Sequence, residues 1–281
     1  MLINLFFNLI LMIFLSKRSS YVIIINVMGK IISVVNQKGG VGKTTTSINL
    51  GAYLSHFGKS VLLVDLDPQS NATSGLGISR NNLERGVYEV LAGPYSFKEV
   101  MTETNHQGFF LAPSTASLAG ANVEFVFLDR REFRLYDNLL EIKNDFDYIL
   151  IDCPPSLGLL TLNGLTAADQ ILIPVQAEYF ALEGLGQLVE TIQLIKESLK
   201  PELDILGVIL TMYDNRFKLA NDVLRELYSY FPSKIFRSVI PRSVRLSEAP
   251  SYGQSILQYN PKSKGAKAYE RLAKEFLFLT S

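Results

Sequence analysis

Cysteine is nearly absent from this sequence, since Cys153 is the only one among 281 residues. One cysteine excludes an intramolecular disulfide and a metal site made of several cysteines of one chain, and it fits a reducing compartment. The sequence also lacks internal repeats, low-complexity tracts and long linkers. With 48% hydrophobic and 19% charged residues, the composition is typical of a globular protein, and the length favours one large core over two independent enzymes.

No apolar run reaches the roughly 20 residues that cross a bilayer as a helix. The most apolar stretch, Met1–Leu15, is followed by Lys17 and Arg18, whereas a signal peptide carries its positive charges before the apolar run. No small-residue cleavage site is evident after it. These features argue against a cleaved signal peptide and leave a short membrane anchor as one open interpretation of the N-terminus.

Charges are unevenly distributed although the formal net charge is zero. The segment Arg216–Lys274 has 12 Lys or Arg against 4 Asp or Glu, a net charge of +8. Met28–Asn215 has 13 basic against 22 acidic residues, a net charge of −9. A basic C-terminal fifth on an acidic body indicates a surface for a polyanion. Lysines scattered over a solvated surface are the alternative interpretation.

After residue 28, short apolar runs alternate with longer amphipathic stretches, which is typical of βαβ units. The alternation predicts an α/β fold with a doubly wound, mostly parallel sheet flanked by helices. The expected strands are Ile31–Val35, Val61–Asp65, Phe109–Ala112, Tyr148–Asp152, Ile171–Val175, Leu206–Thr211 and Ile235–Ile240. The main expected helices are Lys43–His56, Arg131–Asn144, Leu182–Leu199, Ala220–Tyr230 and Lys264–Phe278. Ligands bind such sheets at the carboxyl ends of strands, so the residues that follow strands are candidate site residues.

A glycine-rich segment, Asn36–Thr45, follows the first expected strand and leads directly into an amphipathic helix. This is the context of a P-loop, in which backbone N–H groups and the helix N-terminus hold phosphates. Lys43 is placed to neutralise the β- and γ-phosphates, and the Thr44 hydroxyl to hold Mg²⁺. A glycine-rich turn with incidental lysines is the alternative. The predicted cradle comprises Lys38, Gly39, Gly40, Val41, Gly42, Lys43, Thr44 and Thr45.

Three aspartates lie at the ends of expected strands. Asp65 and Asp67 are two residues apart, and side chains two apart on an extended strand point the same way, so we expect both to face the phosphate pocket. Asp152 ends an apolar strand in a Walker B pattern, which predicts an outer-sphere partner for Mg²⁺. Aspartates that only end a strand and begin a turn are the alternative.

The P-loop departs from the common motif, because Gln37 stands where the first glycine is usual and Lys38 follows it. The sequence KGGVGKTT resembles the deviant Walker A box of the ParA/MinD superfamily of P-loop NTPases. The resemblance implies an ATPase that hydrolyses ATP to ADP and phosphate with Mg²⁺, and a Lys38 that crosses a dimer interface to the partner's nucleotide. It also implies that Asp65 helps to hold the magnesium shell and that Asp67 orients or activates the attacking water.

The similarity extends from Met28 to about Lys274. It includes DLDPQSNATSGLG at 65, DCPPSLGLLTLN at 152, PVQAEYFALEGL at 174, LTMYDNR at 210 and VIPRSVRLSEAPSYG at 239. The last three segments resemble the ParA/Soj proteins that partition chromosomes and plasmids. This resemblance implies that Pro241 and Arg242 lie near the adenine, and that Arg216 and Arg245 bind DNA without sequence preference.

The ParA/Soj resemblance also implies partners and a location. We expect an ATP-dependent homodimer that binds double-stranded DNA non-specifically and is released when a ParB-like centromere-binding protein stimulates hydrolysis. The expected location is cytoplasmic and nucleoid-associated, and the cargo is a chromosome or a plasmid.

The alternative within the superfamily is a MinD-like cell-division ATPase that cycles on membranes. The apolar tail Phe276–Leu279 has no flanking basic cluster beyond Arg271 and Lys274, so no membrane partner is expected. Iron proteins of nitrogenase-like systems share the P-loop but need two cysteines per subunit, so we expect Cys153 only to pack. A metabolic P-loop protein is the remaining alternative.

Met28 begins the segment MGKIISVVNQKGG, which resembles the usual start of Soj-like proteins. We therefore expect residues 1–27 to be a mis-annotated upstream extension, with a membrane anchor or a structured extension as the alternatives. Residues 28–281 are expected to form one P-loop ATPase domain with a basic C-terminal part.

Overall fold

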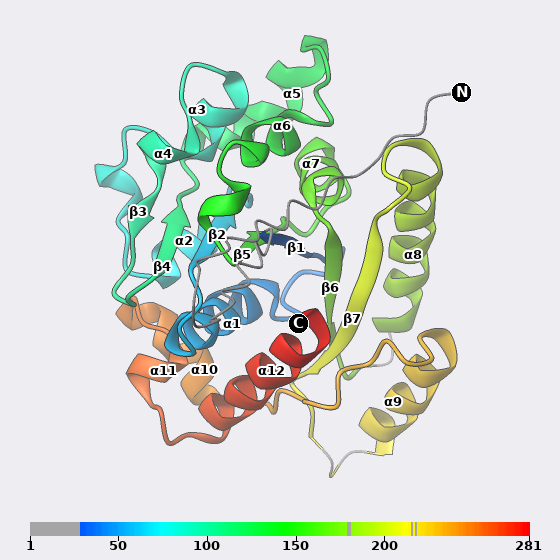
Figure 1. The fold of residues 1–281 in the computed structure, drawn as a ribbon. Helices are drawn as coiled ribbons and strands as arrows, with labels where there is room; N and C mark the ends of the chain where they lie inside the picture. Colours follow the sequence, from blue (N-terminus) through cyan, green and yellow to red (C-terminus); the bar gives the residue numbers. More distant parts are fainter. Residues whose placement is uncertain (1–28, 179–180, 215, 217) are drawn as a thin grey trace, which may run out of the picture.

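The structure is a computed structural model that describes residues 29–178, 181–214, 216 and 218–281, so the expected extension 1–27 and its boundary at Met28 lie outside the described residues. Seven strands form one sheet in the order β3-β4-β2-β5-β1-β6-β7 (Figure 1). The strands are β1 Lys30–Val34, β2 Val61–Asp65, β3 Thr102–Glu103, β4 Phe109–Ala112, β5 Tyr148–Asp152, β6 Gln170–Gln176 and β7 Asp204–Thr211. Only β3 is antiparallel to its neighbour, which confirms the predicted mostly parallel sheet.

Helices cover both faces of the sheet, as expected for right-handed crossovers between parallel strands. Side chains of α1, α2, α11 and α12 join the core cluster on one face, and those of α3, α6, α7, α8 and α9 join the cluster on the other. The helices are α1 Lys43–His56, α2 Asn71–Gly75, α3 Val87–Ala92, α4 Phe97–Val100, α5 Ala121–Glu124, α6 Arg134–Leu140, α7 Leu159–Ala167, α8 Ala181–Ser198, α9 Lys218–Tyr230, α10 Val244–Glu248, α11 Ile256–Tyr259 and α12 Lys264–Thr280. Short 3₁₀ turns occupy Arg80–Asn82, Ala116–Gly120, Phe125–Phe127, Lys143–Asp145 and Ala249–Tyr252.

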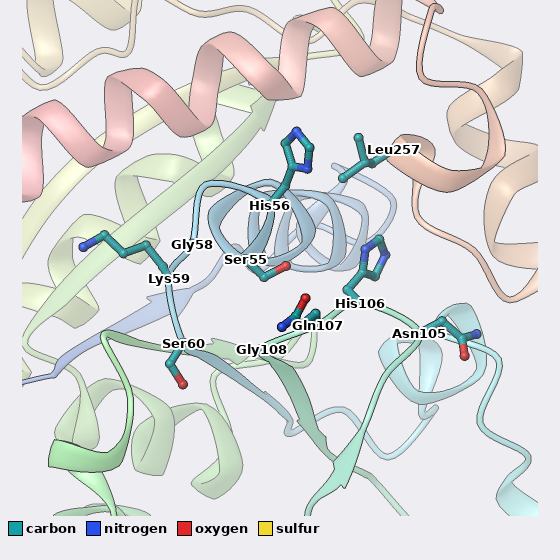
Figure 2. Close-up of a pocket in the computed structure, with 10 residues that line it drawn as sticks. All are labelled: Ser55, His56, Gly58, Lys59, Ser60, Asn105, His106, Gln107, Gly108 and Leu257. Carbon is teal, nitrogen blue, oxygen red and sulfur yellow. The ribbon is translucent and has the colours of Figure 1, made fainter.

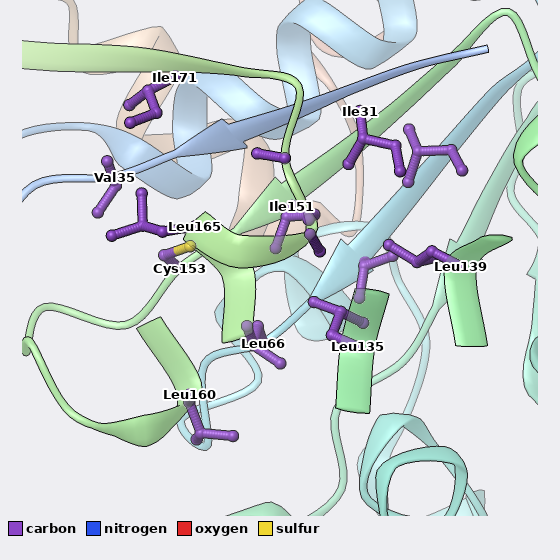
Figure 3. Packing of buried hydrophobic residues seen from close by; sticks show 14 of the residues in the cluster. Ile31, Val35, Leu66, Leu135, Leu139, Ile151, Cys153, Leu160, Leu165 and Ile171 are labelled. Carbon is purple, nitrogen blue, oxygen red and sulfur yellow. The ribbon is translucent and has the colours of Figure 1, made fainter. Parts of the chain in front are cut away.

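Alternate residues of the central strands enter the two core clusters, because successive side chains of a strand point to opposite faces. Ile31 packs on the face with α7, for example, and Ile32 packs on the face with α1. Figure 3 shows the first cluster, with Cys153 next to Leu165 of α7. Burial raises the pKa of the Cys153 thiol to about 12, so this cysteine packs as a neutral side chain, as predicted.

The register of the three central strands brings their carboxyl ends level. β5 pairs with β1 on one side and β2 on the other, and Asp152 stands opposite both Val34 and Asp65. The loop after β1, the end of β2 and the end of β5 therefore meet at one edge of the sheet, where the candidate site residues were predicted to lie.

The strand predicted at Ile235–Ile240 is wrong. This segment runs beside β7 and forms only isolated bridges, at Ile235 and at Pro241. Between them, the backbone N–H groups of Arg237 and Ser238 donate to the two carboxylate oxygens of Glu275 on α12, at 2.6 and 2.8 Å. The Phe236 and Ile240 N–H groups bond to β7, so a continuous ladder would also need the Ser238 N–H, which the carboxylate takes instead.

The helix expected at Arg131–Asn144 begins later, at Arg134. The carbonyl oxygens of Arg131 and Glu132 accept hydrogen bonds from the Asn163 amide and the Thr166 hydroxyl of α7. Side chains of α7 thus donate to carbonyl oxygens that backbone N–H groups would bind in the first turn of the longer predicted helix. The short antiparallel strand β3 was not predicted.

Glu275→Ala should lower the free energy of unfolding by roughly 1–2 kcal/mol, because two backbone N–H groups lose a charged acceptor and one of them, on Ser238, is buried. Urea denaturation measures this. Glu270→Ala is the matched control on the same helix, since the Glu270 carboxylate forms an exposed ion pair with Lys274, and it should change stability less. Equal effects of the two variants would show that Glu275 does not stabilise the segment.

Candidate active site

The loop after β1 reaches α1 through two glycines with left-handed backbone. Gly40 has a φ of +74° and Gly42 a φ of +91°, a conformation that glycine adopts without steric cost. The Lys38 N–H donates to the Asn36 side chain at 3.0 Å, and the Thr46 N–H makes the first helical bond to the Gly42 carbonyl. The predicted strand, P-loop and helix are therefore present in the predicted order.

Lys43, the first residue of α1, is held inside this loop. Its side chain is buried, and its Nζ donates to the carbonyl oxygen of Lys38 at 3.1 Å. Burial lowers the pKa of Lys43, while the nearby carboxylates of Asp152 and Asp67 oppose that shift. Among the described residues, the hydrogen bond of this ammonium goes to a neutral oxygen, which an anionic ligand could replace.

Asp152 is fully buried and bound to α1 by two hydroxyls. Thr44 Oγ1 donates to one carboxylate oxygen at 2.7 Å, and Ser47 Oγ donates to the other at 3.0 Å. Burial raises the pKa of Asp152 to about 6. The contact places the Thr44 hydroxyl beside Asp152, the two residues predicted to hold and to support Mg²⁺. Ser47 was missed by the sequence analysis, although it lies one helical turn after Lys43.

Asp65 and Asp67 do not face the same space. The Asp65 carboxylate is fully buried, and one of its oxygens accepts from the N–H and the hydroxyl of Thr73, at 2.8 and 2.7 Å. Burial, followed by the charge of Asp152, raises the pKa of Asp65 to about 7. β2 ends at Asp65, so the extended geometry that would align the two side chains stops before Asp67.

A cavity of about 350 Å³ opens over the loop and α1, and Asp67 lines it. An adjoining cavity of about 300 Å³ contains Pro241 and Arg242. The first is lined by Gly39, Gly40, Gly42, Lys43, Thr44, Thr45, Ile48, Asp67, Asn71, Pro155, Met212 and Pro250. The two cavities share Gly42, Thr45 and Met212. Of the residues predicted for the phosphates, all but Lys38 and Val41 line the first cavity, and the two residues predicted for the adenine line the second.

Lys38 is tied to its own chain by a residue that the sequence analysis missed. Its Nζ lies 3.2 Å from the Glu178 carboxylate, which also lies 3.8 Å from the Arg242 guanidinium. All three side chains are at least one-third exposed, so these ion pairs are weak and can exchange partners. Glu178 follows β6, and its position just after a strand is the only feature of the sequence that could have identified it as a site residue.

The two arginines predicted to bind DNA lie on the surface, outside both cavities. Arg216 is 81% exposed and pairs with Asp214 through two of its nitrogens, and Arg245 is 55% exposed and pairs with Glu248 at 2.8 Å. Exposed ion pairs of this kind contribute at most about 1 kcal/mol. The arginines are therefore accessible, and their present partners do not prevent binding to another anion.

Another cavity, of about 600 Å³, lies at the C-terminal end of α1 (Figure 2). With a rise of about 1.5 Å per residue, the helix places it roughly 20 Å from the P-loop end of α1. His56 and His106, the two histidines of the chain, line it, and burial lowers the pKa of His106. The described residues contain no group of three or more His, Cys, Asp or Glu side chains placed to hold a metal ion. Its distance from the P-loop separates this cavity from the candidate active site.

Comparison with known proteins identifies relatives over most of the chain. A family described as an AAA domain matches residues 29–205. The chain is 54% identical over 248 residues to the sporulation initiation inhibitor protein Soj of Bacillus subtilis, covering 88% of this chain and 98% of Soj. It is 50% identical over 250 residues to the chromosome partitioning protein ParA of Myxococcus xanthus, covering 89% and 88% of the two chains.

A solved structure is also similar. A Mycobacterium smegmatis protein described as cobyrinic acid a,c-diamide synthase, with bound ATP analog and magnesium, superposes with a TM-score of 0.80 at 39% identity, covering 89% of this chain and 94% of that one. None of the described helices combines the length and the apolar character needed to span a membrane.

The raised pKa values give a pH prediction for Mg²⁺. A raised carboxyl pKa means that the folded protein takes up protons, so the stabilisation from protonated Asp65 and Asp152 is lost as the pH rises through about 6 to 7. Mg²⁺ favours the ionised carboxylates, so its binding with nucleotide should release protons at pH 6.5 and fewer at pH 8.5. Calorimetry in two buffers of different ionisation enthalpy counts them. The Asp152→Asn variant should release fewer protons than wild type at pH 6.5. Equal proton release by the two proteins would contradict the assignment of Asp152 to the Mg²⁺ site.

Proposed function

Because the chain belongs to the ParA/Soj family of chromosome-partitioning ATPases, we propose that it uses Mg²⁺ and ATP to switch between a free form and a homodimer bound to DNA. The observation that carries the proposal is the pair of adjoining cavities at one edge of the sheet, with Lys43, Thr44 and Asp67 in one and Arg242 in the other. Such a pair suits a ligand with a polyanionic end and a flat heterocyclic end.

The phosphates of ATP would lie over the loop, where the Gly39–Thr45 backbone and the N-terminus of α1 favour negative charge. The Lys43 ammonium would exchange its bond to the Lys38 carbonyl for the phosphate oxygens. Mg²⁺ would supply charge neutralisation beside the Thr44 hydroxyl, and the related structure with ATP analog and magnesium supports this. Asp152 would support the ion through Thr44, and Asp65 through its position beside Asp152.

Asp67 is the residue we assign to the attacking water. It lines the cavity, and its backbone is fixed by the Ser114 hydroxyl, which donates to its carbonyl oxygen at 2.8 Å. One carboxylate oxygen accepts from the Gln69 N–H at 2.9 Å, while the other accepts no hydrogen bond from the described residues. A rigid carboxylate with one open oxygen can orient a water, which is what phosphoryl transfer needs from the protein.

Dimerisation would release Lys38 from Glu178. The pair in the single chain keeps the Lys38 ammonium beside the cavity rimmed by Arg242, and the phosphates of a second subunit offer more negative charge than one carboxylate. Lys38 would then stabilise charge on the partner's nucleotide, which makes each active site incomplete without a second copy.

DNA binding would use the basic C-terminal part. Arg216 and Arg245 are accessible, and phosphates would replace their carboxylate partners. Such contacts carry no base readout, so binding would be independent of sequence. A ParB-like centromere-binding protein is the proposed stimulator of hydrolysis and release.

Single substitutions separate the steps of this cycle. Lys43→Ala should weaken ATP binding by at least about 100-fold, because a desolvated phosphate loses its main cation. Asp67→Ala should bind ATP but hydrolyse it at least about 100-fold more slowly, and Lys38→Ala should bind ATP without dimerising. Equilibrium binding, phosphate release and sedimentation velocity test these outcomes. Lys59→Ala is the control, because Lys59 follows the far end of α1 and lines the cavity remote from the P-loop. Wild-type turnover by Asp67→Ala would refute its catalytic role.

The DNA surface has a separate test in the Asp67→Ala background with ATP present. The double variant Arg216→Ala/Arg245→Ala should bind unrelated duplexes more weakly, and the slope of log K against log salt should fall by roughly 1 for each lost contact. Arg130→Ala is the control, because Arg130 is also exposed and paired, with Asp137, but lies outside the basic segment. If the double variant kept the affinity and slope of its parent, these arginines would not contact DNA.

A further inference from the structure

One of the residues shared by the two cavities has a strained backbone. Met212 has a φ of +50°, one of four positive φ values at non-glycine positions among the described residues. The left-handed conformation costs a side-chain-bearing residue roughly 1–2 kcal/mol, and such strain persists where surrounding structure enforces it. Of the four residues, only Met212 lines either of the two cavities over the P-loop.

The neighbours of Met212 show what enforces this conformation. Thr211 ends β7, and its hydroxyl donates to the Val41 carbonyl of the P-loop at 2.7 Å. On the other side, the Tyr213 N–H donates to the Ile240 carbonyl at 3.0 Å, and Tyr213 forms a bridge with Pro241. Met212 is therefore the single residue between an anchor on the P-loop and an anchor on the segment that leads to Arg242.

The same position places Met212 where the two cavities meet. It lines the cavity that holds Lys43 and Asp67 as well as the cavity that holds Pro241 and Arg242, and its side chain is half-buried. A thioether on an unbranched chain is apolar and adapts to the shape of what it contacts. Such a side chain suits contact with a sugar or with the edge of a base, and it carries no hydrogen-bond donor or charge for a phosphate.

We propose that Met212 is a nucleotide-contact residue, and that its left-handed backbone directs the side chain against the nucleoside of bound ATP at the junction of the two cavities. This inference rests on the proposed function, because it takes the adjoining cavities to be one ATP site. It adds a contact that neither the P-loop nor Pro241 and Arg242 provides. The strain is retained because it holds the apolar wall between the phosphate end and the base end of the ligand.

Paired substitutions at Met212 separate backbone strain from ligand contact. Met212→Ala and Met212→Gly both remove the thioether, and both should weaken ATP binding by about 5- to 20-fold, as expected for the loss of one half-buried apolar contact. They differ only in Cβ, so the glycine variant should unfold about 2–4 °C above the alanine variant without nucleotide. Met212→Leu keeps the apolar bulk and should bind ATP within about twofold of wild type.

Two controls identify the source of any change. Magnesium tripolyphosphate lacks the nucleoside, so its affinity should be the same in wild type and in all three Met212 variants. Ser233→Gly relieves a φ of +69° at an exposed position outside both cavities, and it should leave ATP affinity unchanged.

ATP affinity within twofold of wild type in both Met212→Ala and Met212→Gly would overturn the proposal. Equal losses of ATP and tripolyphosphate affinity would also overturn it, by showing that Met212 only supports the P-loop. Failure of wild type itself to bind ATP would instead refute the proposed function.

Discussion

The parallel register of β1, β5 and β2 is the constraint on which the rest of the site depends. This register places Asp152 opposite Val34 and Asp65, so the P-loop begins beside two buried carboxylates. Thr44 and Ser47 of α1 then close the arrangement by hydrogen bonds to Asp152. A slip of one residue in β5 would turn Asp152 to the opposite face of the sheet and remove the partner of the Thr44 hydroxyl. The fold and the site are thus specified by the same pairing.

Three buried ionisable groups meet at the site. Asp65 and Asp152 are both fully buried and have raised pKa values, while Lys43 is buried with a lowered pKa and a carbonyl as its hydrogen-bond partner. Mg²⁺ and phosphates would satisfy these groups together, so ligand binding should stabilise the folded state strongly. Lys38 differs in being partly exposed and paired with one carboxylate, and an exposed pair of this kind can exchange partners.

Much of this arrangement could be predicted from local sequence, and the remainder depended on distant contacts. The P-loop and Asp152 were predictable because a strand, a loop and a helix are consecutive in sequence, and α1 begins and ends where expected. The Lys38–Glu178 pair joins residues 140 positions apart, and the false strand at Ile235–Ile240 is broken by Glu275 on α12. The strand at Asp65 ends too early to align Asp67 with it, which periodicity cannot show.

The central claim is that the P-loop of one chain is completed by Lys38 of a second. The most direct measurement is a structure of the Asp67→Ala variant with ATP and Mg²⁺, because this variant is expected to hydrolyse ATP slowly. The account predicts a twofold dimer in which each Lys38 ammonium has left Glu178 and contacts the phosphates bound by the other subunit. ATP bound in the P-loop cavity of a single chain, with Lys38 still paired to Glu178 and no second subunit over the nucleotide, would contradict it.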